Sequence, residues 1–133
     1  MAYTRTIARR NATINAEITA YGTAAALVIY ADSASAPTVD AALPGTATIL
    51  ATITLGNPSH GAASAGSSAL TGTPSSIATA TGTALYFRIL VTGTVVAQGS
   101  CAVSASDLNF AGGTTITSGG TVTLSSGTLS QAA

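Results

Sequence analysis

The chain has 133 residues, of which only 6% are charged and 5% aromatic, and its formal net charge is zero. Its single cysteine excludes an intrachain disulfide, and no apolar run reaches the roughly 18 residues that a membrane-spanning helix needs. An ordinary domain carries about 25% charged residues. The low charge therefore indicates either a neutral Thr/Ser/Gly surface that is soluble by itself or, as we expect, a surface largely covered by partners. High apolar content with no net charge is the reverse of the disorder signature and predicts a folded chain.

The first half of the chain begins with ten residues, 1–10, that are expected to form an extended N-terminal arm. Apolar and polar residues then alternate over residues 11–20, which predicts a half-buried strand. Residues 25–30 are continuously apolar, which is typical of a strand covered on both faces. Residues 32–45 contain two prolines and are expected to form a loop.

The middle of the chain shows the clearest alternation. Over residues 46–55 the odd-numbered positions after Gly45 are apolar and are expected to face the core. Residues 56–76 are rich in Gly, Ala, Ser and Pro, which predicts a long loop. Residues 83–90 and 94–103 predict two strands joined by a hairpin turn at Thr92-Gly93.

The C-terminal part predicts two more strands, at residues 114–117 and 121–125, and a flexible tail at residues 126–133. Residues 11–125 would then form one all-β domain with about eight short strands. Strands at this spacing indicate a single-domain antiparallel β-sandwich, and a jelly-roll arrangement is the form we expect.

Residues able to carry chemistry are few, and they do not cluster along the sequence. His60 lies in a turn-like segment with no nucleophile motif beside it, and Cys101 falls at an inward position of its strand, where a buried small apolar role is expected. A catalytic centre needs several such groups held together, and a metal site needs three or four clustered ligands. The sequence therefore predicts a non-enzymatic protein without a metal site or a cofactor.

Four arginines are the only cations in the chain. Arg5, Arg9 and Arg10 lie in the first ten residues, where they could pair with acidic groups of a partner protein or form part of a frayed terminus. Phosphates are a weaker alternative, so a nucleic-acid partner is not expected. Arg88 and Tyr86 are expected on the outer face of their strand, as an interface anchor or as a simple cross-strand contact.

Five segments of the chain carry a family resemblance, at residues 45–58, 80–89, 96–100, 106–110 and 116–123. The most specific parts are Ala80-Thr81-Gly82-Thr83, followed by Phe87-Arg88-Ile89, and Asp107-Leu108-Asn109. Together, in this order, the segments resemble small β-rich virion structural proteins of tailed bacteriophages.

This resemblance implies a capsid decoration (cement) protein that bridges capsid subunits, assembles as a dimer or trimer and has no active site. Its partners would be the major capsid protein or other virion proteins, and its location the virion, after assembly in the host cytoplasm. A tail, neck or fibre-associated role and a host-surface glycan-binding module remain open alternatives.

Overall fold

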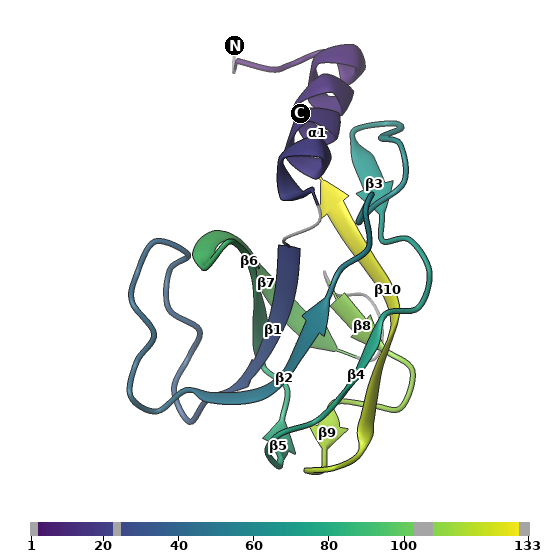
Figure 1. Ribbon diagram of the computed structural model, residues 1–133. Coiled ribbons are helices and arrows are strands. Elements are labelled where there is room, and N and C mark those ends of the chain that lie inside the picture. The colour runs from purple at the N-terminus through teal and green to yellow at the C-terminus, as the bar shows by residue number, and fades with distance from the viewer. Residues whose placement is uncertain (1–2, 23–24, 103–107, 131–133) are drawn as a thin grey trace.

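The computed structural model describes residues 3–22, 25–102 and 108–130, and within them it contains one helix followed by ten strands (Figure 1). The all-β, sandwich-like fold predicted from the sequence is confirmed. The elements are α1 (Ile7–Tyr21), β1 (Ala25–Ala31), β2 (Thr48–Thr54), β3 (Ser67–Ala69), β4 (Ser75–Ile77), β5 (Gly82–Thr83), β6 (Tyr86–Val91), β7 (Thr94–Ala102), β8 (Leu108–Phe110), β9 (Thr115–Ile116) and β10 (Thr121–Ser130).

Eight strands form one strongly curled sheet. Its order is β2-β1-β6-β7-β8-β10-β3, and β4 also pairs with β10. β4 contacts β2 as well, and next to it the amide of Thr79 donates to the carbonyl of Leu50 over 2.8 Å, so the sheet curls back on itself. The pairing of β7 with β8 is parallel, so the sheet is mixed. A small ribbon of β5 and β9 lies at the end opposite α1 (Figure 1).

The main core fills the inside of the curl and is built from β1, β2, β6, β8 and β10. The continuous apolar run predicted to be covered on both faces is β1, and this prediction is confirmed. Leu27 and Ile29 point into the main core. Val28 and Tyr30 pack on the other face against Tyr86, in a second and smaller cluster.

The strand predicted over residues 11–20 is wrong, because this segment belongs to helix α1. The alternation depended on alanines, which fit either period. The large apolar side chains Ile14, Ile18 and Tyr21 instead recur at helical spacing, and all three are buried on one face. Helical spacing of the large residues is therefore the signal that decided the local structure.

The extended arm predicted for residues 1–10 is also shorter than expected. Its described part is extended only before Ile7, and Arg9 and Arg10 lie in the first turn of α1. The side-chain oxygen of Thr6 accepts a hydrogen bond from the amide of Arg9 over 3.3 Å, which caps the helix. This cap explains why the helix begins inside the segment that was expected to stay extended.

α1 is fixed to the rest of the chain through two asparagines. The Asn11 Oδ1 atom accepts a hydrogen bond from the amide of Gly66 over 2.8 Å, and the Asn15 Oδ1 atom accepts one from the amide of Ala63 over 2.9 Å. The helix therefore rests on the segment between β2 and β3, at one end of the curled sheet (Figure 1).

A β-bulge interrupts the predicted alternation of β2. Pairing with β1 jumps from Ile29 opposite Ala51 to Tyr30 opposite Ile49, so that Leu50 has no directly opposed residue. Leu50 and Ala51 are both buried, whereas Ile49 is 47% exposed. A bulge moves all residues before it to the other face, which is why Ile49 does not face the core as predicted.

The turn at Thr92-Gly93 is confirmed as the connection of the hairpin between β6 and β7. Both residues have positive φ, 52° at Thr92 and 81° at Gly93. Positive φ at both central residues is characteristic of two-residue type I′ hairpin turns, whose backbone twist matches that of the paired strands.

Two expectations about irregular segments are wrong. Residues 56–76, predicted as one long loop, contain β3 and the start of β4. Residues 126–130, predicted as part of a flexible tail, continue β10 and pair with β3 and β8; residues 131–133 lie outside the described part of the chain. Short Ser and Thr side chains accept strand geometry when a neighbouring strand supplies the hydrogen bonds, and local composition does not reveal that neighbour.

Candidate functional site

The exposed N-terminal surface combines cations with apolar side chains. Tyr3 is 86% exposed and Ile7 is 53% exposed, and Arg5 and Arg9 are exposed beside them. Tyr3, Arg5 and Arg9, together with the outward side of α1, form an open depression, which we call the N-terminal groove; Ile7 lies outside it. Its lining residues are Tyr3, Thr4, Arg5, Thr6, Arg9, Ala12, Thr13 and Ala16.

Arg10 differs from its two neighbours because it is turned toward its own chain. Its guanidinium lies against Gly66, and a Cβ atom at that glycine would be only 2.6 Å from the Nη1 atom. The Nε atom is buried and has no hydrogen-bond partner among the described residues. Arg10 therefore takes part in the packing of α1 on the segment before β3, and Arg5 and Arg9 are the N-terminal cations that face outward.

Arg88 points away from the main core and contacts Gln98 on the paired strand, as predicted, but it is buried and so is not an exposed interface anchor. Its side chain is 3% exposed. The Nε atom donates to the side-chain oxygen of Gln98 over 2.8 Å, and Nη2 donates to the carbonyls of Thr38 and Ala41 over 3.2 and 2.9 Å. The loop between β1 and β2 folds over this face and covers it, which the alternation pattern could not show.

Tyr86 is buried beside Arg88, at 1% exposed, and is likewise not a surface anchor. Its ring stacks on that of Tyr30, with centroids 5.2 Å apart, and its hydroxyl donates to Asp32 over 3.2 Å. The pKa of Asp32 is lowered by hydrogen bonds from the Thr46 hydroxyl and from the amide of Ala34. Burial, followed by the hydrogen bond to Asp32, raises the pKa of Tyr86.

These buried polar groups have a common structural effect. The Gln98 amide, which accepts from Arg88, also donates to the carbonyl of Pro37. Arg88, Gln98, Tyr86 and Asp32 thus connect β6 and β7 to the start and the middle of the loop between β1 and β2. We call them the loop-anchoring cluster; their hydrogen bonds hold that loop against the sheet.

His60 lies under the C-terminal end of α1 and is 5% exposed. Its Nδ1 atom is 2.9 Å from the hydroxyl of Ser59, and its ring meets that of Tyr21 edge to face, with centroids 6.4 Å apart. Burial lowers the pKa of His60. The hydroxyl of Tyr21 donates to Glu17 over 2.8 Å, and burial, reinforced by this bond, raises the pKa of Tyr21. Because Ser59 is itself 1% exposed, its hydroxyl cannot meet a large substrate.

The remaining candidates for chemistry are dispersed. Cys101 is partly buried and packs against the main core. Across residues 3–22, 25–102 and 108–130, no three His, Cys, Asp or Glu side chains come together as a metal site would require. No helix in those ranges is both long and apolar enough to cross a bilayer.

Six more large apolar side chains are partly exposed on the β domain, outside the N-terminal groove. They are Val39, Leu43, Ile49, Ile77, Leu85 and Val96. Sequence reasoning placed Ile49 in the core, and the bulge in β2 turns it outward instead.

Comparison with known proteins identified no relative. No protein-family model, no curated protein and no solved structure matches the chain.

Proposed function

We propose that this chain is a non-enzymatic structural subunit of a virion, a capsid decoration protein of a tailed bacteriophage that stabilises the head by bridging capsid subunits. Two lines support the proposal. The five segments described above resemble small virion structural proteins of such phages. A zero net charge with 6% charged residues suits a surface that other subunits cover, because free monomers normally depend on surface charge to prevent association.

The N-terminal groove is the observation that carries the proposal. α1 uses one face, with Ile14, Ile18 and Tyr21, to pack on its own chain, and it presents Arg9 on the outward side together with Arg5. Arginine and tyrosine side chains are the ones most often found at the energetic centre of protein interfaces. The guanidinium groups fit an acidic surface on a neighbouring capsid subunit.

The exposed apolar side chains of the β domain offer a second contact area. Ile49 lies on β2 and Ile77 on β4, two strands that contact each other, and they are 47% and 57% exposed. A subunit that bridges neighbours needs more than one contact area, and this area lies apart from α1. Assembly of the decoration protein as a dimer or trimer is part of the proposal.

The test is binding to purified heads of the phage that encodes the chain. Wild-type protein and an Arg5→Gln/Arg9→Gln variant are incubated with heads that lack the protein, and the bound fraction is measured by cosedimentation. We expect the variant to bind about tenfold or more weakly, since two charge-assisted contacts are lost. Thr83→Glu/Thr94→Glu is the control, because it changes the net charge by the same amount at exposed strand positions away from both proposed contact areas.

Three results would decide between the alternatives. Equal loss in both variants would mean that net charge alone governs binding, and the groove would be the wrong surface. Binding to tails but not to heads would replace the decoration role by the tail or neck role. No binding to any virion part would overturn the proposal. Residues 56–76 do not support the glycan-binding alternative as a free binding loop, because that segment contains β3 and packs against α1.

A further inference from the structure

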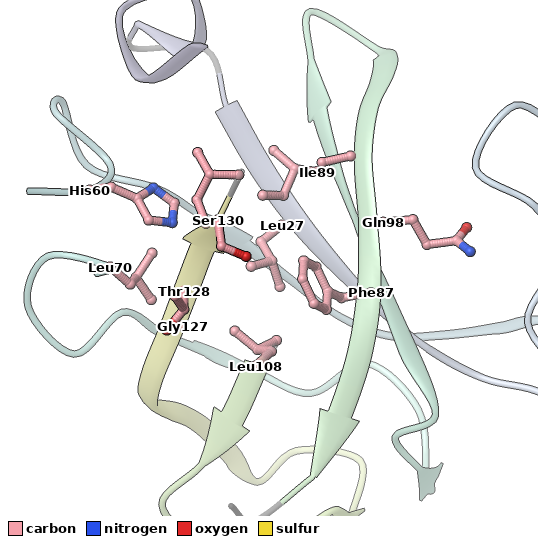
Figure 2. Close-up of a pocket in the computed structure, with 12 residues that line it drawn as sticks. Leu27, His60, Leu70, Phe87, Ile89, Gln98, Leu108, Gly127, Thr128 and Ser130 are labelled. Carbon is pink, nitrogen blue, oxygen red and sulfur yellow. The ribbon is translucent and has the colours of Figure 1, made fainter. Parts of the chain in front are cut away.

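A small pocket opens inside the curl of the sheet, at the end where α1 lies. It has a volume of about 150 Å³. Most of its wall is apolar and comes from core strands, with Leu27, Phe87, Ile89 and Leu108 among the lining residues. Gln98 also borders it, but Figure 2 shows its amide pointing away, toward the loop-anchoring cluster. The pocket therefore differs from both surfaces described above.

His60 is the polar side chain that distinguishes this pocket from an ordinary packing defect. It is 95% buried, and Figure 2 shows its ring turned inward among the lining side chains. Ser59 occupies the Nδ1 atom, which fixes the ring orientation. Among the residues that the structure describes, the opposite ring nitrogen, Nε2, makes no hydrogen bond, and it is not fully buried, so a ligand in the pocket can reach it. An accessible ring nitrogen without a partner in the protein can form a hydrogen bond to a ligand.

We propose that this pocket binds a single-ring aromatic compound with one hydroxyl group, with the ring between the apolar side chains and the hydroxyl on His60 Nε2. The volume limits the ligand to one ring, because an apolar cavity of roughly 150 Å³ holds a molecule of the size of benzene. The hydroxyl can donate or accept, so it suits either tautomer of the neutral imidazole. This inference does not depend on the proposed virion function.

The probes are phenol and toluene, which have nearly the same shape and differ in the hydroxyl. Titration followed by protein NMR shifts gives a dissociation constant for each. Wild-type protein should bind both, with the largest shifts at Leu27, Leu70 and Leu108. In a His60→Leu variant, toluene binding should persist, and the ratio of the phenol to the toluene dissociation constant should rise about tenfold, as expected for one lost hydrogen bond.

A second variant tests the pocket without touching His60. Ala97 lines the pocket from β7, and Ala97→Leu should fill it and abolish binding of both probes. Val96→Leu is the control, because Val96 is the neighbouring residue on the same strand and is exposed; it should bind as the wild type does. Absence of wild-type binding at millimolar concentrations, or binding that Ala97→Leu leaves unchanged, would overturn the proposal. If the ratio of the phenol to the toluene dissociation constant is unchanged in a folded His60→Leu variant, His60 does not take part in ligand binding.

Discussion

Arg88 keeps its charge inside the protein without a carboxylate acceptor. The three oxygens to which it donates are an amide and two backbone carbonyls, all uncharged. Burial of a cation is tolerated only when its hydrogens are satisfied, and here the two carbonyls belong to the loop that covers it. Cation and loop therefore stabilise each other, and neither can be replaced alone.

Replacement of Arg88 by methionine should lower the free energy of unfolding by about 2–4 kcal/mol, because the Gln98 amide and two carbonyls lose their donor in a buried site. Urea denaturation monitored by circular dichroism measures this. Arg9→Met is the matched control; its side chain is exposed, so it should change stability by less than about 0.5 kcal/mol. Equal midpoints for the two variants would contradict the role assigned to Arg88.

Gly66 is required for two separable reasons, its positive φ of 81° and the contact with Arg10. Gly72 has a φ of 67° and nothing within 4 Å of a Cβ atom. Gly72→Ala should therefore show backbone strain alone, about 1–2 kcal/mol, and Gly66→Ala should be more destabilising by up to about 1 kcal/mol, because the end of the flexible Arg10 side chain has to move aside.

Combination of Gly66→Ala with Arg10→Ala tests the contact directly, by the same denaturation measurement. Without the guanidinium, Gly66→Ala should lower the free energy of unfolding by about as much as Gly72→Ala does. If the double variant retains the full additional loss, the obstruction is not Arg10.

The pH dependence of stability should reflect His60. Burial holds its pKa below the ordinary value of 6.5, so the unfolded chain binds a proton more readily than the folded protein. Stability is then fully present above about pH 6.5 and declines as the pH falls from there toward the folded-state pKa. Urea midpoints between pH 8 and pH 5 measure the decline, and His60→Gln should reduce it. An identical decline in the variant would assign it to other groups.

At the scale of the element, α1 depends on the side chains that connect it to the rest of the molecule. Isolated helices of 15 residues are only marginally stable in water. The buried face with Ile14, Ile18 and Tyr21 and the hydrogen bonds of Asn11 and Asn15 supply what local propensity lacks.

An Asn11→Ala/Asn15→Ala variant should undock α1 more often, since two backbone amides lose their acceptors. Hydrogen exchange of the α1 amides should accelerate, while exchange in β1 and β6 stays unchanged. Thr13→Ala/Thr19→Ala is the control, because these hydroxyls donate only to carbonyls within the helix. Faster exchange throughout the protein would mean that α1 and the sheet unfold together.

The elements also show how far sequence reasoning reached. Elements with a strong local signal, β1 and the Thr92-Gly93 turn, were predicted correctly, because a continuous apolar run and a turn residue specify their own conformation. β3 and the end of β10 were missed because their Ser- and Thr-rich residues become strands only through pairing with distant segments. For the candidate site, charge alone singled out Arg5 and Arg9, and the structure places both on the exposed surface. The burial of Tyr86 and Arg88 and the pocket at His60 depend on a loop and a curl that alternation does not encode.

For the molecule as a whole, low charge and exposed apolar side chains predict self-association. Ile49→Thr/Ile77→Thr keeps β-branched residues at both positions and should lower the concentration-dependent mass measured by light scattering behind a sizing column. Val96→Thr, at a similarly exposed apolar position, is the control and should leave the mass unchanged. A wild-type protein that remains monomeric at high concentration would contradict the expectation and would weaken the proposed dimer or trimer.

The position of β10 has a consequence for synthesis in the cell. β10 pairs with β3, β4 and β8, so the sheet cannot close before residues 121–130 have left the ribosome. Until then the nascent chain carries apolar strands without their partner, for several seconds at ordinary elongation rates of about 5–20 residues per second. A nascent chain in that state is a natural client for chaperones that bind at the exit tunnel.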